Sequence, residues 1–145
     1  MKNKPLFVEA DLYIHAYDVD VMGYVSNIVY IRWFEDMRHH MLDIVYPFEK
    51  MIEEGISPVL MHTEVDYLRP FTIHDKPKGR CWMSKAGGTK WELHHEIVQG
   101  DVVHCAGVQR GYTMDLKTQK PVKLPQKMLD VFKAESDNKE VSGLD

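Results

Sequence analysis

The order of sequence patterns along this chain predicts an α+β fold. A strand-like run at residues 6–16 precedes a helical run that starts at Asn27, and four strand-like runs follow residue 58. Successive later strands are separated by the tight-hairpin sequences Gly87-Gly88-Thr89 and Gly100-Asp101. Strands joined by such short turns pair antiparallel. We therefore expect an antiparallel sheet of about five strands wrapped around one long central helix.

Length and composition fit one globular domain. The chain has 145 residues, of which 44% are hydrophobic and 28% are charged, so a second full domain has no room. We expect a single domain over residues 1–133 and a polar, disordered tail over residues 134–145. The formal net charge of −4 argues against nucleic acid as a partner, because such domains carry a basic excess.

Segment composition also bears on location and on the thiols. No stretch approaches the roughly 18 apolar residues of a membrane span, and the charged N-terminus lacks a secretory apolar core. We therefore expect a cytoplasmic protein with no membrane span. Cys81 and Cys105 lie in strand-like segments without metal-ligand spacing, so we predict buried thiols rather than a disulfide.

The long helix is predicted from apolar residues that recur at steps of three and four. Ser26 or Asn27 is its expected N-cap, and Pro47 ends it. Further apolar positions, such as Ile28 and Ile44, suggest packing against a sheet. The main stripe consists of Tyr30, Phe34, Met37, Met41 and Val45.

The remaining elements follow from alternation and turn residues. We expect a short helical connector at 48–54 and a terminal helix within 121–133. The later strands are predicted at 59–68, 78–85, 90–99 and 102–114.

A loop with two carboxylates and a glycine lies just before the long helix. Its sequence, Asp18-Val19-Asp20-Val21-Met22-Gly23-Tyr24-Val25-Ser26-Asn27, resembles the Asp-x-Asp-x-x-Gly-x-Val-x-Asn pattern of hotdog-fold acyl-CoA thioesterases, in particular the 4-hydroxybenzoyl-CoA thioesterase-like group. The resemblance runs from about Leu6 to about Leu116 and includes Asp66-Tyr67-Leu68-Arg69-Pro70 as a strand end. Tyr24 is a departure from the family pattern, in which many relatives carry His or another residue after the glycine.

The resemblance implies a hotdog fold and hydrolysis of an acyl-CoA to a carboxylic acid and free CoA, without cofactor or metal. It implies that Asp20 is the catalytic carboxylate, as nucleophile or general base, and that Asn27 supports catalysis mainly through its backbone. A homodimer or homotetramer with sites near the subunit interface is also implied. The substrate-binding residues that it suggests are Gly23, Tyr24, Val25, Tyr30 and Arg69.

The chemistry of a thioester is compatible with this set of residues. Its leaving thiol has a pKa of about 8.5, so it needs little help from a general acid. Unpaired N–H groups at the helix start could hold the oxyanion. The structural alternative is that Asp18 and Asp20 form turns and caps, and Asp18 is the better candidate for that role. Tyr30 has a core alternative, since it begins the apolar stripe.

Two other functions are compatible with the sequence. An acyl-ACP thioesterase would use basic residues such as Lys76, Lys78 and Arg80 to meet an acidic carrier protein. A catalytically silent acyl-binding protein is the other, because fold alone does not imply chemistry. The adjacent pairs His39-His40 and His94-His95 do not converge on a metal, and no serine-nucleophile elbow occurs.

Overall fold

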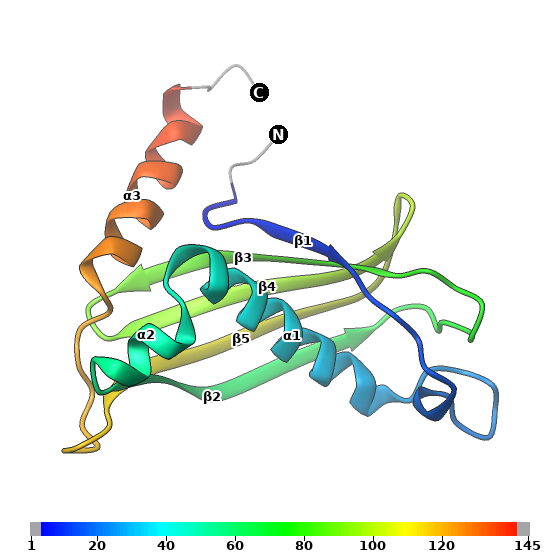
Figure 1. Cartoon of the computed structure of the whole chain (residues 1–145). Helices are drawn as coiled ribbons and strands as arrows, with labels where there is room; N and C mark the ends of the chain where they lie inside the picture. The colour runs from blue at the N-terminus through cyan, green and yellow to red at the C-terminus, as the bar shows by residue number, and fades with distance from the viewer. Residues whose placement is uncertain (1–3, 142–145) are drawn as a thin grey trace.

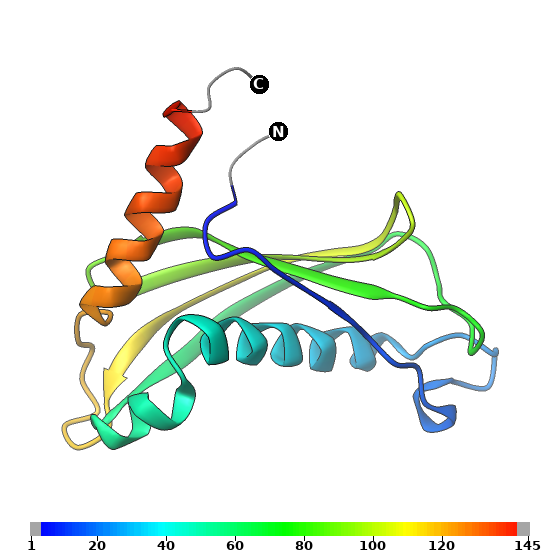
Figure 2. The same ribbon diagram turned by 45° about the horizontal axis from the view of Figure 1, so that its top comes forward.

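The computed structural model describes residues 4–141, and the predicted α+β order is confirmed there. The five strands form one sheet in the order β1-β3-β4-β5-β2, and all neighbouring strands are antiparallel. The sheet curves over α1, which crosses one of its faces (Figures 1 and 2). The elements are β1 (Val8–Asp11), the 3-10 turn η1 (Ala16–Asp18), α1 (Asn27–Val45), α2 (Phe48–Glu53), β2 (Ile56–Tyr67), β3 (Lys78–Gly87), β4 (Lys90–Gln99), β5 (Val102–Asp115) and α3 (Gln126–Val141).

The meander forms where the hairpin residues predict it. Gly88 joins β3 to β4 with φ of +58°, and Gly100 joins β4 to β5 with φ of +59°. These left-handed conformations favour glycine, which has no Cβ to clash with the backbone. The meander therefore has the predicted strand order, and β4 has the predicted bounds.

The first strand is shorter than predicted, because its partner strand β3 begins only at Lys78. β1 pairs with β3 from Val8 opposite Cys81 to Asp11 opposite Lys78. The next partner residue is Pro77, which has no N–H; its carbonyl still accepts the Leu12 N–H at 2.9 Å. The chain then leaves the sheet, so residues 13–16 approach the start of α1 instead of extending the strand.

The C-terminal helix is longer than predicted. We expected a disordered tail from Ala134, but α3 continues to Val141, and residues 142–145 lie outside the described part of the chain. Good helix formers such as Ala134 and Glu135 follow the apolar turn. The Glu135 carboxylate also accepts the Leu6 N–H at 2.7 Å, so this segment contacts the N-terminal strand region.

Two hydrophobic clusters share α1. The cluster around the N-terminal half contains Tyr30, Trp33, Phe34 and Phe71. The cluster around the C-terminal half includes Met37, Met41, Met51, Met83 and Met128, with residues from β1, β3, β4 and α3. Of the further apolar positions predicted to pack, Trp33 is buried, whereas Ile28 and Ile44 are 61% and 62% exposed. The helix therefore buries one face and leaves the other uncovered.

Phe34 packs against a glycine of β5. Its side chain is fully buried, and a Cβ built on Gly107 would lie 2.4 Å from the Phe34 ring. The same ring stacks on His95, with centroids 4.4 Å apart. The absence of a side chain at position 107 thus lets the helix approach the sheet closely.

A buried polar group connects α1 to the sheet beside Phe34. Arg38 Nη1 donates to Gln109 Oε1 at 2.8 Å, and His95 Nε2 lies 2.9 Å from the same oxygen. Because that oxygen already accepts from the guanidinium, neutral His95 carries its proton on Nε2. Burial, together with the nearby Arg38 charge, lowers the pKa of His95 to about 3, although the Gln109 bond opposes this.

We expect His95 to make the fold acid-sensitive. Its folded pKa lies below the ordinary value of about 6.5, so between these values the unfolded chain binds more protons. The unfolding free energy should therefore fall, by at most about 1.4 kcal/mol per pH unit, as pH drops from 6.5 to 5. In urea titrations at several pH values, the unfolding free energy of His95→Gln should vary less with pH than that of the wild type. The exposed His39→Gln should show the same pH dependence as the wild type. An unchanged slope in His95→Gln would contradict this.

The two thiols are buried, as the sequence predicts. Cys81 and Cys105 are free and buried, and burial raises the pKa of the Cys105 thiol to about 12. In residues 4–141, no helix has the length and apolar character needed to cross a membrane.

Candidate active site

The loop before α1 folds as a miniature hairpin. Val19 and Val25 form an antiparallel bridge, and the Asp20 N–H donates to the Tyr24 carbonyl at 2.8 Å. Gly23 completes the turn with φ of +83°, and its N–H donates to the Asp20 carbonyl at 3.0 Å. Gly23 therefore has a conformational role that explains the glycine of the motif.

The Asp20 carboxylate lies at the tip of this hairpin and is exposed. Its Oδ1 accepts the N–H groups of Met22 at 2.9 Å and Tyr24 at 3.2 Å. One oxygen thus performs the turn-forming role expected of an aspartate. Among residues 4–141, no group bonds to the other oxygen, so the same side chain can shape the loop and present a carboxylate oxygen to a ligand.

The start of α1 offers unpaired donors close to this loop. Ser26 is the N-cap, but its side chain makes no capping bond. Within the described chain, the N–H groups of Asn27 and Ile28 have no acceptor. The first N–H groups of a helix also carry the positive end of its dipole, so this helix end can hold a developing negative charge.

One cleft of about 230 Å³ brings the predicted residues together. Six of the seven predicted site residues line it, and Gly23, the seventh, is in the adjoining turn. Tyr30 is only 2% exposed, so it serves the core and also closes the cleft. The lining residues are Asp20, Tyr24, Val25, Asn27, Tyr30, Tyr67, Leu68, Arg69 and Pro70.

Tyr67, Leu68 and Pro70 were not among the predicted site residues. Tyr67 ends β2, and its hydroxyl donates to the Asn27 carbonyl at 3.1 Å. Burial, with Cys105 nearby, raises the pKa of Tyr67, so its phenol stays a donor at neutral pH. The N–H groups of Leu68 and Arg69 both donate to the His104 carbonyl. The Tyr67-Leu68-Arg69-Pro70 motif was the available signal, because it marks the strand end that reaches α1.

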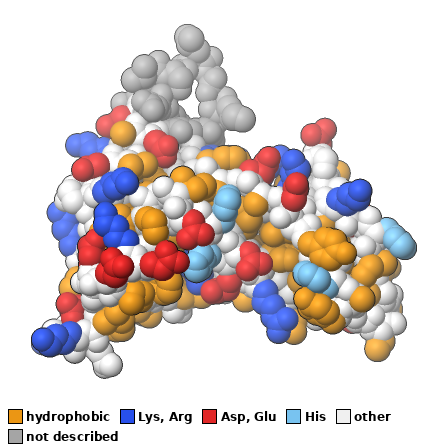
Figure 3. Space-filling view, viewed as in Figure 1, with side chains coloured by type: hydrophobic (Ala, Val, Ile, Leu, Met, Phe, Trp, Pro, Cys, Tyr) orange, Lys and Arg blue, Asp and Glu red, His pale blue; other side chains and the backbone are white. Residues whose placement is uncertain are grey.

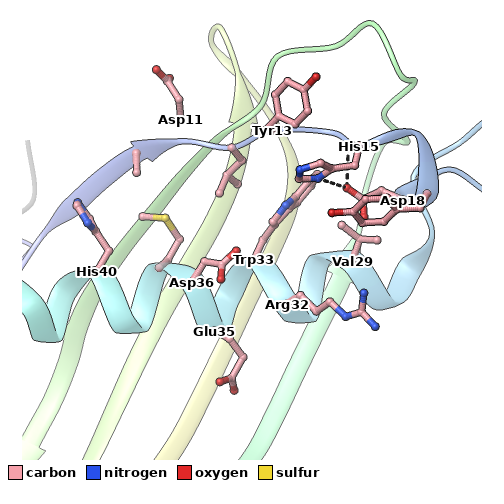
Figure 4. A pocket seen from close by; sticks show the side chains of 14 residues that line it. Asp11, Tyr13, His15, Asp18, Val29, Arg32, Trp33, Glu35, Asp36 and His40 are labelled. Atoms are coloured by element: carbon pink, nitrogen blue, oxygen red, sulfur yellow. Dashed lines mark hydrogen bonds and ion pairs between the residues drawn. The ribbon is translucent and has the colours of Figure 1, made fainter. Parts of the chain in front are cut away.

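A larger cleft of about 610 Å³ lies on the opposite side of α1 and does not include Asp20. Figure 4 shows the segment after β1 on one side of it and α1 on the other, with Asp18 beside His15. Its carboxylates are mostly paired: Asp18 with His15, Glu35 with Arg38 at 2.5 Å, and Asp11 with Lys78 at 3.8 Å. We therefore assign the candidate active site to the smaller cleft.

Asp18 forms hydrogen bonds on both sides of the hairpin, with His15 before it and Ser26 after it. Its side chain is buried, and Oδ2 lies 2.8 Å from the His15 N and 3.2 Å from His15 Nδ1. Its carbonyl accepts the Ser26 N–H at 2.8 Å. Asp18 therefore connects the segment before the hairpin to the N-cap of α1, which agrees with the structural role expected for it.

We expect Asp18→Ala to destabilise the fold by about 1–3 kcal/mol, because it leaves the His15 N–H without its acceptor. Urea unfolding measures this loss. The exposed Asp11→Ala should cost less than about 0.5 kcal/mol. Equal losses in the two variants would contradict a structural role for Asp18.

Hydrophobic side chains are concentrated around the candidate site. Figure 3 shows hydrophobic side chains at the right-hand end of this face, the end that holds the loop, and a second group at its lower left. Val21 is fully exposed, and Met22, Ile28 and Tyr24 are 72%, 61% and 42% exposed. Exposed apolar patches of this kind mark ligand or partner surfaces.

A curved antiparallel sheet that wraps one long helix is the architecture of the hotdog class of α+β proteins. A family model described as the thioesterase-like superfamily matches residues 14–132. The chain therefore belongs to the thioesterase-like superfamily, which confirms the predicted family and the class of thioester hydrolase.

Two known proteins illustrate the likeness. The long-chain acyl-CoA thioesterase FadM of Escherichia coli (strain K12) is 26% identical over 120 residues, which cover 81% of this chain and 90% of FadM. The DHNA-CoA thioesterase from Staphylococcus aureus has a similar structure, with a TM-score of 0.80 and 19% identity over 94% of this chain and 93% of that one. The structural likeness confirms the hotdog fold.

Proposed function

We propose that this protein hydrolyses an acyl-CoA thioester and that Asp20 supplies the reacting carboxylate. The observation that carries the proposal is that Asp20, which has one free carboxylate oxygen, and Asn27, whose N–H is unpaired at the start of α1, line the same cleft. Acyl transfer needs these two parts, a nucleophile or base and an oxyanion site. The acyl-CoA substrate of FadM supports CoA as the carrier.

The reaction proceeds through one tetrahedral intermediate at the thioester carbonyl. Asp20 either attacks the carbonyl carbon or takes a proton from a water that attacks it. The electron pair of the C=O bond moves to oxygen, where the N–H groups of Asn27 and Ile28 stabilise it. The C–S bond then breaks, and the thiolate leaves without a proton from the enzyme. In the nucleophile route, water hydrolyses the resulting anhydride.

The first test is turnover of aromatic and aliphatic acyl-CoAs, measured as release of free CoA thiol. The proposal expects saturable hydrolysis of at least one member, with carboxylic acid and CoA formed in equal amounts. Tight binding without hydrolysis throughout the panel would contradict it and favour an acyl-binding protein. Matched acyl-ACP substrates tell the carriers apart: we expect a higher kcat/KM for acyl-CoA than for acyl-ACP.

A single turnover in ¹⁸O-labelled water distinguishes the two routes. Attack by Asp20 on the acyl group allows the subsequent hydrolysis to put ¹⁸O into the aspartate side chain. General-base catalysis puts ¹⁸O directly into the product acid. Mass spectrometry of the peptide that contains Asp20 reads out the difference.

We also propose that two copies pair along β2. This strand of twelve residues lies at the edge of the sheet and pairs with β5 on one side. An exposed edge strand is a template for pairing with another chain, and β2 carries Met61, which is 71% exposed. A second copy there would adjoin the end of β2 that holds Tyr67, next to the apolar patch around Asp20.

Light scattering after gel filtration should give twice the mass of one chain, or four times if dimers associate further. We expect Met61→Glu to shift the protein toward the monomer, because a charge at the interface is costly. Val102→Glu, at an exposed position of β5, is the matched control and should leave the mass unchanged. A monomeric wild type would overturn the pairing.

A further inference from the structure

Aromatic side chains close the inner end of the Asp20 cleft. Tyr30 lies edge-on to Tyr67, with ring centroids 5.3 Å apart, and it stacks on Phe71 at 6.2 Å. Tyr30 and Phe71 are 2% and 0% exposed and belong to the core cluster behind the cleft. The cleft therefore ends at Tyr30 and does not continue as a tunnel along α1.

Tyr67 presents its ring to the cleft in a fixed orientation. It lines the cleft and is 45% exposed. Its hydroxyl bond to the Asn27 carbonyl and the edge-on contact with Tyr30 hold the ring from both ends. A side chain held in this way loses little conformational entropy when a ligand packs on it.

The position of Tyr67 relative to the reacting groups brings it close to the acyl group. The Asn27 carbonyl accepts a hydrogen bond from the Tyr67 hydroxyl. The N–H of the same residue is unpaired at the start of α1. A thioester whose oxygen faces these N–H groups therefore has its first acyl carbons near Tyr67. A flat, conjugated acyl group can stack on this ring, whereas a saturated ring of similar size is too thick to do so equally well.

We infer that Tyr67 is a specificity-determining residue that makes the site prefer flat, conjugated acyl groups to saturated ones of the same size. The inference rests on the proposed function for the location of the carbonyl. Beyond the proposed function, the inference specifies the class of acyl group and the residue that selects it. The hydroxyl of Tyr67 is expected to orient the ring, and the ring face to select the acyl group.

The test compares benzoyl-CoA with cyclohexanecarbonyl-CoA, which have rings of equal carbon number. We expect the wild type to favour benzoyl-CoA about three- to tenfold in kcat/KM, the range of an aromatic pair. Tyr67→Leu should bring the ratio near one, and Tyr67→Phe should keep most of the preference. Tyr17→Leu, at a 78% exposed tyrosine outside this cleft, is the control and should keep the wild-type ratio.

Binding of two thioethers that cannot be hydrolysed, S-benzyl-CoA and S-cyclohexylmethyl-CoA, provides an independent readout. Calorimetry should show the same preference in the wild type and its loss in Tyr67→Leu. If these affinities differ as expected but no thioester is turned over, the proposed function fails and the inference stands. A wild-type affinity ratio near one, or a ratio that Tyr67→Leu leaves unchanged, would overturn the inference.

Discussion

Asp20→Asn is expected to lower kcat for acyl-CoA hydrolysis by about 10²–10⁴-fold, the usual contribution of a catalytic base. The asparagine carbonyl can still accept the Met22 and Tyr24 N–H groups that now bond to Oδ1. The loop should therefore keep its shape while it loses the charge and the basic oxygen. Rates measured under substrate saturation, with circular dichroism to verify folding, give the result.

The matched control for this change is Asp101→Asn. Asp101 is an exposed residue of the turn between β4 and β5, so the same chemical change there should leave kcat within about twofold of the wild type. Asp20→Asn with a wild-type kcat would refute the assignment of Asp20. An equal fall in both variants would mean that the loss is not specific to the cleft.

Phe34→Ala is expected to cost about 3–5 kcal/mol of unfolding free energy, as for other fully buried phenylalanines. The ring fills the space above Gly107 and stacks on His95. Its removal would leave a cavity between α1 and Gly107 of β5. The neighbouring Arg38, Gln109 and His95 would also lose part of the apolar cover over their buried hydrogen bonds.

Urea denaturation with equal m-values is the appropriate measurement. Ile28→Ala is the matched control, since it truncates another large apolar residue of α1 that is 61% exposed, and it should cost less than about 0.5 kcal/mol. A small loss for Phe34→Ala would show that the helix can close the cavity by moving toward the sheet.

Local patterns predicted most of the elements. The stripe from Tyr30 to Val45 identified α1, and the glycine-containing turns at residues 87–88 and 100–101 identified the meander. The pairing of β1 with β3 was not predictable, because a strand's partner depends on contacts between residues far apart in the sequence. The early end of β1 follows from that pairing, since Pro77 lies in the partner segment. The helical continuation to Val141 was missed because polar composition alone suggested disorder.

The candidate site also has a part that local sequence predicted and a part that depends on contacts between distant segments. The loop from Asp18 to Asn27 was identifiable from its motif, and the structure brings Asp20, Asn27 and Arg69 to one cleft. The place of Tyr67 in that cleft depends on the end of β2 meeting the start of α1. The Tyr67-Leu68-Arg69-Pro70 motif marks the end of the strand, but it does not say which part of the chain this end contacts, because Tyr67 and Asn27 are forty residues apart.

Because the core is divided into two clusters, heat tolerance and substrate preference depend on different parts of the molecule. The methionine-rich cluster lies around the C-terminal half of α1, whereas the Asp20 cleft adjoins the N-terminal half. Substitutions that improve packing around Met41, Met83 and Met128 can therefore raise the melting temperature without changing the shape of the cleft. Heat tolerance and substrate preference can thus be selected independently, at opposite ends of one helix.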